Sequence, residues 1–360
     1  MAQKITHLLL VALILSLGFG QLLRFDLLGL PIYLHDVLVI LILALQGLTL
    51  KDEPNPAFGG EGQTLKLFFI GLSLGWVSAL LHYPLAHLLL PSLYTLRLLA
   101  YLALYFILLR HKLSLDHRYF VISGLSCAVI GLLQYFLLPD MRIFQYLGWD
   151  DHLFRLTLPH FDPTFSAVML GLFALTLNRS QWFIGLMVIW SILLTYSRST
   201  WLSLSLTFAL FMRPKKYLFF LVPILLVAIL LLPRRFGEGT NLFRTYSISS
   251  RLDADLYYLQ TYNWDLVLGR GLNTLVLDSP TTQPKNHATG PNNSYLYLLT
   301  TTGVLGLLGW VGFMFSLYRS SPYRPMLIFF FVAALFNNVM FYPFALLWVL
   351  LVESTVPSGA

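Results

Sequence analysis

The sequence predicts an all-α integral membrane protein with about 12 transmembrane helices and one long loop on the outer face. Of its 360 residues, 57% are hydrophobic and only 11% are charged, whereas soluble domains carry roughly 25% charged residues. Apolar stretches of roughly the 17–25 residues that span a bilayer recur from the first residues to the last. We therefore expect a single polytopic membrane domain over residues 1–360, with no large soluble domain.

Charge and cysteine content exclude several classes of protein. The net charge is +7, but the basic residues occur in ones and twos at the ends of apolar runs, which is typical of topology signals and not of a nucleic-acid groove. The only cysteine, Cys127, lies inside an apolar run, which excludes a disulfide framework and a cysteine-based metal site. The run from Ile5 to Gly20 lacks a following small-residue cleavage site, so we interpret it as a span and not as a signal peptide.

Five apolar runs fill the N-terminal part of the chain. The first follows Lys4, the second ends before Lys51 and the third ends before Pro84. The fourth ends before Arg110, and the fifth ends before Pro139. From these runs and their breaks we expect spans at 5–22, 30–50, 65–83, 86–109 and 119–138.

Seven further runs follow, several of them short. A polar break around Arg198 separates the seventh run from the eighth, and a long polar segment separates the ninth from the tenth. Short spans are expected to tilt little or to begin below the membrane interface. The expected spans are 163–178, 181–196, 199–212, 217–232, 294–318, 325–339 and 341–352.

Basic residues predict the orientation of these spans. With the N-terminus in the cytoplasm, every short inside loop has at least one lysine or arginine, and twelve spans return the C-terminus to the cytoplasm. The two longest outer segments are then 139–162 and 233–293, and long loops follow the charge rule poorly. The basic residues of the inside segments are Lys4, Lys51, Lys66, Arg110, Lys112, Arg118, Arg179, Arg213, Lys215, Lys216, Arg319 and Arg324.

The outer segment 233–293 contains one predicted amphipathic helix, Ser249–Val267. Its apolar residues fall at helical spacing, and a glycine-rich turn follows it. The apolar positions are Leu252, Leu256, Leu259, Tyr262 and Leu266, and the turn is Gly269-Arg270-Gly271-Leu272-Asn273.

Arginines within or beside the spans are functional candidates, because a charge in lipid is expensive. Arg97 lies inside the fourth expected span, and Arg198 lies at the break between the seventh and the eighth. A guanidinium group offers paired donors to phosphate oxygens and stays protonated. Several arginines at one membrane face would therefore bind a lipid-linked phosphate or pyrophosphate. Snorkelling or a structural ion pair, such as Arg24 with Asp26, is the alternative for any single arginine.

The outer segment 139–162 is rich in acidic, histidine and aromatic residues. Asp150, Asp151, His152, His160 and Asp162 are of the types that bind metals, but no two of them occur at a recognised ligand spacing. We therefore predict no metal site. Aromatic residues beside polar groups also fit sugar stacking or an interfacial aromatic belt.

A set of short motifs occurs in a characteristic order over most of the chain. They are Tyr33-Leu34-His35-Asp36-Val37-Leu38, Leu96-Arg97-Leu98, Gln134-Tyr135-Phe136, Arg155-Leu156 with Phe161-Asp162-Pro163-Thr164-Phe165, Ser197-Arg198-Ser199, Ser250-Arg251, Gly269-Arg270-Gly271-Leu272-Asn273, and Asn293-Ser294-Tyr295-Leu296 with Gly303-Val304-Leu305-Gly306. In this order, with a long outer loop between the ninth and tenth spans, they resemble the O-antigen ligase and O-antigen polymerase superfamily. Residues 181–318, which include the outer loop 233–293, resemble its Wzy C domain.

The resemblance implies an inverting, metal-independent glycosyltransferase of the GT-C type that needs no cofactor. Its donor would be a glycan linked to undecaprenyl pyrophosphate, and its acceptor a hydroxyl of a glycan, a lipid or a protein. Ligases of this superfamily use the lipid A core of lipopolysaccharide, and polymerases use another lipid-linked repeat. The implied location is the bacterial cytoplasmic (inner) membrane.

The same resemblance suggests which residues bind the donor. Arg198 and Arg251 are expected to bind the pyrophosphate, with Arg97, Arg155 and Arg270 as further candidates. Fixed cations beside a departing diphosphate would supply the main catalytic effect.

The expected catalytic base is the point at which this sequence departs from the superfamily. Asn292 stands where the superfamily usually has a histidine, and asparagine cannot act as a base. Either His287, five residues upstream, takes the proton near neutral pH, or the proton goes to bulk water and Asn292 only orients the acceptor. A solvated loop position is the alternative reading of His287.

Two other functions stay open at this point. A transporter or flippase for lipid-linked glycans would use the same arginines without a base, although the sequence lacks the two similar halves of many transporters. A catalytically silent membrane scaffold is the second alternative, and the asparagine at position 292 is the feature that favours it.

Overall fold

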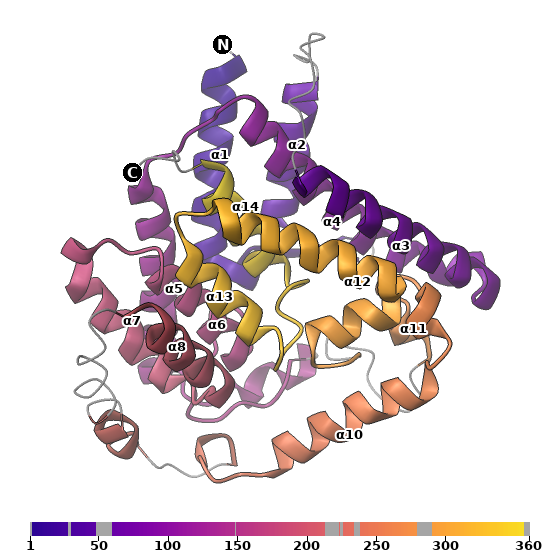
Figure 1. Cartoon of the computed structure of the whole chain (residues 1–360). Helices are drawn as coiled ribbons and strands as arrows, with labels where there is room; N and C mark the ends of the chain where they lie inside the picture. The colour runs from indigo at the N-terminus through magenta and orange to yellow at the C-terminus, as the bar shows by residue number, and fades with distance from the viewer. Residues whose placement is uncertain are drawn as a thin grey trace.

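The computed structural model describes residues 2–27, 30–47, 60–147, 149–212, 223, 226–233, 238–278 and 290–355. In these residues, five helices are long and apolar enough to cross a membrane (Figure 1). They are α1 (Ala2–Phe19) with the 3-10 turn η1 (Gly20–Leu23), α3 (Gly60–His82), α4 (Leu85–Arg110), α5 (His117–Leu137) and α12 (Ser294–Ser320).

Shorter helices complete the bundle. The apolar ones are α2 (Leu34–Gly47), α6 (Pro163–Ala174), α7 (Trp182–Leu194), α8 (Arg198–Phe211), α13 (Arg324–Ala333) and α14 (Pro343–Thr355). Those outside the expected spans are α10 (Tyr246–Thr261), α11 (Asp265–Leu268), η2 (Met141–Leu147), η3 (Arg179–Gln181), η4 (Glu238–Thr240) and η5 (Leu275–Asp278). The expected ninth span, 217–232, lies mostly outside the described residues.

The surface of the bundle is apolar where the long helices face outward. Leu8 of α1, Leu81 of α3 and Leu137 of α5 are 68%, 81% and 77% exposed. A soluble protein of this size rarely exposes contiguous apolar area on this scale. The apolar helices therefore belong to a membrane protein, as the composition predicts.

The core of the bundle is centred on α14. Every residue from Phe344 to Val352 is buried, because α14 packs against α4, α6 and α1. Trp348 makes edge-on ring contacts with Phe120 and Phe173, at centroid distances of 5.5 and 6.3 Å. Burial on all sides explains why this helix is apolar all round.

A β-hairpin precedes α2 and corrects the expected start of the second span. Strand β1 (Arg24–Leu27) pairs antiparallel with β2 (Leu30–Tyr33), with Arg24 opposite Tyr33 and Asp26 opposite Pro31. The expectation that this helix begins at residue 30 is wrong, because α2 begins at Leu34. Pro31 accounts for the difference: it donates no backbone hydrogen bond and biases the residue before it towards an extended conformation.

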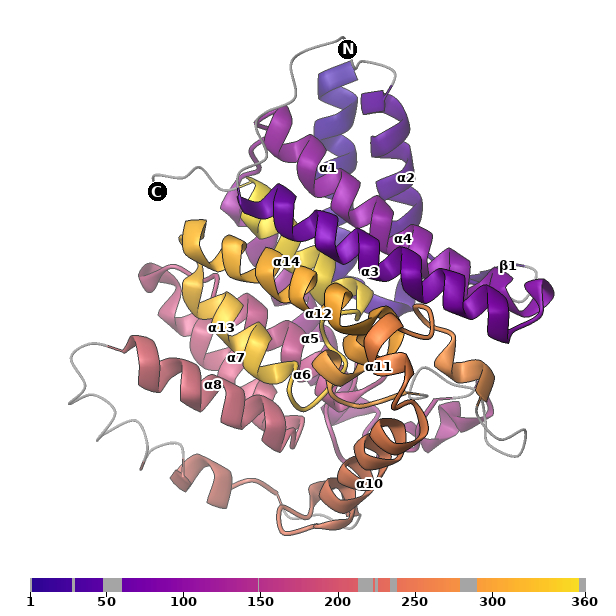
Figure 2. The ribbon, with the colours of Figure 1, turned by 45° about the vertical axis from the view of Figure 1, so that its right-hand side comes forward.

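Helices α3 and α12 pack side by side along most of their length (Figure 2). Glycines allow this approach, since a Cβ at Gly71 would lie 2.2 Å from the backbone nitrogen of Gly306, and one at Gly309 would lie 2.2 Å from that of Phe68. Small residues at such contacts are typical of membrane helix pairs.

A kink at Gly303 interrupts α12. Gly303 has φ +69° and ψ −176°, a conformation that favours glycine. The carbonyl groups of Thr300 and Thr301, which lie just before the kink, accept the N–H groups of Arg270 and Gly271, both at 2.9 Å. The glycine-rich motif at 269–273 is therefore held against the kinked helix by its backbone.

Segments that are far apart in sequence meet at the end of the bundle where α10 lies (Figure 1). The Tyr83 hydroxyl donates to Asp278 at 2.5 Å, and the guanidinium of Arg24 lies 5.5 Å from the ring centroid of Trp149. The start of α1 lies at the opposite end of the bundle (Figure 1). There the Gln46 amide donates to Thr6 at 2.7 Å. The segments expected on the outer face are thus close to one another.

The predicted amphipathic helix in the outer segment is present but shorter than expected. Helix α10 ends at Thr261, and α11 begins only at Asp265. Tyr262 is buried and donates to Asp278 at 2.7 Å. Leu252 and Leu256, in contrast, are more than half exposed, so none of the residues that the structure describes covers this apolar face of α10.

Candidate active site

A cavity of about 910 Å³ lies at the end of the bundle that carries α10. Five separate parts of the chain line it: the loop between α5 and α6, the start of α8, the segment from η4 through α10, the start of α12 and the end of α13. Both long polar segments of the sequence therefore contribute to one site.

Arg155 enters this cavity from the loop between α5 and α6. Its side chain is buried, and its Nε donates to the carbonyl of Thr195 at 2.9 Å. The backbone N–H of the next residue, Leu156, donates to the carbonyl of Leu194 at 2.9 Å. The loop is thus fixed to the end of α7, and this holds Arg155 in position.

Arg198 is the first residue of α8 and lines the same cavity. One of its terminal nitrogens donates to the carbonyls of Leu242 and Arg244, at 3.0 and 2.7 Å. The first turn of a helix has free N–H groups that favour anions. Ser197 and Ser199 add hydroxyl groups at this position. This part of the cavity therefore offers several donors to an anion.

Arg251 reaches the cavity from α10. Its guanidinium donates to the carbonyl of Phe336, just after α13, at 3.1 Å. One turn further along α10, Asp255 accepts the backbone N–H of Asn292 at 3.2 Å. Helix α10 therefore positions both Arg251 and Asn292, which lies just before α12.

The cavity carries more positive charge than its own carboxylates compensate. Burial lowers the pKa of Arg155 to about 9, and the positive charge of Arg244 is the next cause. Arg251 and Arg198 act in the same direction, and Asp162 opposes them. Burial also lowers the pKa of Arg251. Within the described residues, neither Arg155 nor Arg251 forms an ion pair with a carboxylate, so an entering anion would stabilise both cations.

Arg97 lies in a different place from these three arginines. It forms an ion pair of 2.7 Å with Asp36, whose other oxygen accepts the Tyr101 hydroxyl at 2.6 Å. Its guanidinium also lies over the rings of Tyr33 and Tyr94, at 5.2 and 5.0 Å. The expectation that Arg97 belongs to the same anion site is not met by this arrangement.

Arg270 is also separate from the cavity. Its guanidinium lies 3.5 Å from a carboxylate oxygen of Asp265 and 3.8 Å from one of Asp278, and it donates to the Tyr83 hydroxyl at 3.0 Å. These contacts connect the segment after α10 to the end of α3. Nearby carboxylates therefore compensate the charge of Arg270 in this arrangement.

The predicted base region is only partly described. Asn292 lines the cavity beside Asn293, whose side chain caps α12 by accepting the N–H groups of Tyr295 and Leu296 at 2.9 and 3.2 Å. His287 lies outside the described residues. The structure therefore places Asn292 with Arg198 and Arg251 around one cavity.

A second, smaller cavity of about 480 Å³ holds Arg97 and is rich in aromatic side chains. The start of α6 contributes to both cavities, through Phe165 here and Asp162 in the larger one. The aromatic residues that line the smaller cavity are Tyr33, Tyr94, Tyr101, Trp149, Phe165, Tyr297, Phe341 and Tyr342. Aromatic faces beside polar groups suit stacking on sugar rings, but only Trp149 comes from the segment 139–162 for which the sequence suggested it.

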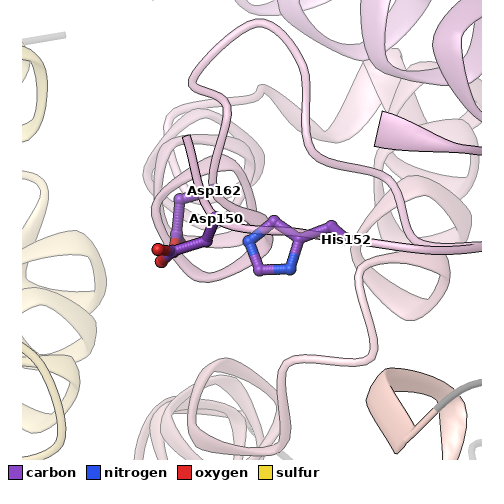
Figure 3. A group of neighbouring side chains, drawn as sticks. All are labelled: Asp150, His152 and Asp162. Atoms are coloured by element: carbon purple, nitrogen blue, oxygen red, sulfur yellow. The ribbon is translucent and has the colours of Figure 1, made fainter. Parts of the chain in front are cut away.

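The loop between α5 and α6 brings three possible metal ligands together (Figure 3). One ligand atom each from Asp150, His152 and Asp162 lie within 4.8 Å of one another. His160, in contrast, is buried against Tyr342, whose hydroxyl lies 2.8 Å from its Nδ1. Spacing in the sequence did not predict this cluster, because the loop doubles back between His152 and Asp162.

No protein-family model matches the chain, and no curated protein is significantly similar to it. The geometry of the site therefore carries the functional argument.

Arg244 is a residue of the cavity that the sequence did not single out. It lines the cavity from the segment before α10 and donates to the carbonyl of Gly239. No sequence motif marks Arg244, and it reaches the cavity because residues 238–246 fold over α8. In the sequence, the one indication was that Arg244 lies in the same long segment as Arg251.

Proposed function

We propose that this protein is a membrane glycosyltransferase that transfers a glycan from undecaprenyl pyrophosphate to an acceptor hydroxyl. The observation that carries the proposal is the convergence of Arg155, Arg198 and Arg251 on one cavity. They come from three separate segments, and the pKa values of Arg155 and Arg251 fall mainly because both guanidinium groups are buried, although Asp162 partly offsets the shift. A diphosphate is the ligand that such a set of cations favours.

In the proposed reaction, the acceptor oxygen attacks the anomeric carbon with inversion. The bond between that carbon and the phosphate oxygen breaks, and the lipid diphosphate leaves with the electron pair. The arginines stabilise the charge that develops on the leaving oxygen. The acceptor proton goes to His287 or to water, and Asn292 orients the acceptor.

We further propose that the chain crosses the membrane twelve times in a GT-C-type arrangement. Both termini then lie in the cytoplasm, and the cavity lies on the outer face of a bacterial cytoplasmic membrane. The acceptor is a second glycan for a polymerase, the lipid A core for a ligase, or a protein for a related enzyme. The resemblance of the motifs supports this part, and the common location of the outer segments is consistent with it.

Arg198→Lys and Arg251→Lys test the diphosphate site. Lysine keeps the charge but loses the planar pair of donors, so we expect each variant to transfer lipid-linked glycan at least about tenfold more slowly in vesicles, the loss that corresponds to roughly 1.4 kcal/mol. Arg118→Lys is the matched control, because Arg118 is exposed and pairs with Asp116. Unchanged transfer by both cavity variants would refute the proposal.

Product analysis in the same vesicles separates the competing functions. A transferase produces a new glycosidic bond, whereas a flippase moves the donor across the bilayer without making one. A scaffold does neither.

A further inference from the structure

Asp150, His152 and Asp162 form a cluster on the wall of the arginine cavity (Figure 3). Their three ligand atoms lie within 4.8 Å of one another. Ligand atoms around a divalent cation at about 2.1 Å are separated by roughly 3–4 Å. Small rotations of these side chains are therefore enough to bring all three to a common ion.

His152 has an unsatisfied nitrogen at this position. Its Nε2 is buried, has no hydrogen-bond partner in the described residues, and points towards the two carboxylates (Figure 3). Its carbonyl accepts the N–H of Met141 at 2.9 Å, and Asp140 pairs with Leu153. These bonds hold the backbone of the loop at His152. A buried nitrogen without a partner is costly, and a metal ion would satisfy it.

Backbone hydrogen bonds fix the orientation of the Asp162 carboxylate. One of its oxygens accepts the N–H groups of Thr164 and Phe165, at 2.6 and 2.9 Å, as the N-cap of α6. The other oxygen has no part in the cap. Hydrogen bonds that fix a carboxylate in this way are typical of the groups behind metal ligands.

We propose that Asp150, His152 and Asp162 bind a divalent cation such as Mn²⁺ or Zn²⁺. Two carboxylates and one imidazole are the ligand types that these ions accept, and three protein ligands leave a position open for an oxygen of a substrate. Five arginines line the same cavity and oppose a cation there, whereas the carboxylates of Asp150 and Asp162 neutralise it. A cation at this site would depart from the metal-independent enzymes that the motifs resemble. On the proposed function, it would be a further ligand for the donor diphosphate.

Binding of Mn²⁺ to the full-length, tag-free protein in detergent tests the site directly. Free Mn²⁺ has an electron paramagnetic resonance signal that is lost on binding, so titration gives stoichiometry and affinity without any substrate. We expect one Mn²⁺ per chain, displaced by Zn²⁺. In Asp162→Asn and His152→Ala, the affinity should fall by more than about tenfold, which is the lower end of the loss when only the groups behind metal ligands are changed.

Two design features keep the result interpretable. Asparagine is as good an N-cap as aspartate, so Asp162→Asn removes the charged ligand while α6 keeps its cap. Asp151→Asn is the matched control, because Asp151 is the exposed neighbour outside the cluster, and it should bind Mn²⁺ like the wild type.

The absence of stoichiometric Mn²⁺ and Zn²⁺ binding would overturn this inference, and so would binding that is unchanged in both Asp162→Asn and His152→Ala. The outcome is separable from that of the proposed function. Failure of Mn²⁺ binding leaves the lysine variants of Arg198 and Arg251 as an independent test, and normal transfer by those variants leaves the cation site intact.

Discussion

At the scale of single residues, the arginines near the outer segments divide into two groups. Arg155, Arg198 and Arg251 line one cavity, whereas Arg97 and Arg270 pair with carboxylates elsewhere. A sequence shows that a charged residue lies within or beside an apolar run. It does not show which carboxylate or carbonyl group offsets that charge, because the tertiary fold determines the partner. Motif order does not separate the two groups either, because Arg97 and Arg270 also lie within motifs but do not line this cavity.

The pair of Arg97 and Asp36 makes a prediction at this scale. Both side chains are largely buried, so Asp36→Asn leaves a cation without compensation and should destabilise the fold by about 3 kcal/mol. Asp36→Asn combined with Arg97→Leu should recover part of that loss. Thermal unfolding in detergent measures both effects.

The control for this prediction is the exposed pair of Arg24 and Asp26, which lies 2.9 Å apart. Asp26→Asn should change stability by less than about 1 kcal/mol. Equal effects of Asp36→Asn and Asp26→Asn would contradict the structural role assigned to the buried pair.

At the scale of elements, the sequence predicted the long helices well and the local departures poorly. The runs behind α3, α4 and α5 have the length that a bilayer imposes, so their ends were placed within a few residues. The hairpin before α2 is a local pairing that interrupts an apolar run, whereas the kink at Gly303 lies where α12 contacts the distant glycine-rich segment. Periodicity within a run has no information about such contacts.

The contact between α3 and α12 is one element on which stability should depend. In Gly71→Val, the new side chain would collide with the backbone of Gly306, and such overpacking costs about 1–3 kcal/mol. Gly185→Val is a matched control, because the atom nearest to a Cβ at Gly185 is 3.8 Å away. Comparison of the melting temperatures of the two variants checks the prediction, which fails if they are equal.

The kink in α12 is expected to hold the glycine-rich segment. A Cβ at Gly303 would lie 2.3 Å from the carbonyl oxygen of Val267, in a backbone conformation that strains alanine. We expect Gly303→Ala to weaken the hydrogen bonds that the backbone N–H groups of Arg270 and Gly271 donate to the carbonyl groups of Thr300 and Thr301. Hydrogen exchange at those two amides should then become faster, whereas exchange in α5 should stay unchanged. Unaltered protection at both amides would contradict this role of the kink.

At the scale of the whole molecule, the structure groups the segments expected on the outer face around two neighbouring cavities. The alternation of apolar runs with basic loops predicts this grouping, since each pass through the bilayer reverses the side of the next loop. The shape of the cavities did not follow from the sequence, because it arises where five loops and helix ends meet.

Cysteine labelling tests the proposed sides of the membrane. The only native cysteine, Cys127, is buried, so introduced cysteines should report with little background. An impermeant maleimide should label Asp253→Cys in intact cells, because α10 is proposed to lie outside. Arg118→Cys should react only after permeabilisation. The reverse pattern would invert the proposed topology.

The larger cavity depends on a bond between α10 and the segment after α13, where Arg251 meets Phe336. During synthesis on the ribosome, that partner emerges only after all five long helices have been made. A premature stop after Ser320 would thus give a fragment that inserts its long helices but leaves Arg251 without this contact. The chain therefore completes the lining of this cavity late in biogenesis, and truncated copies would occupy the membrane with part of that lining missing.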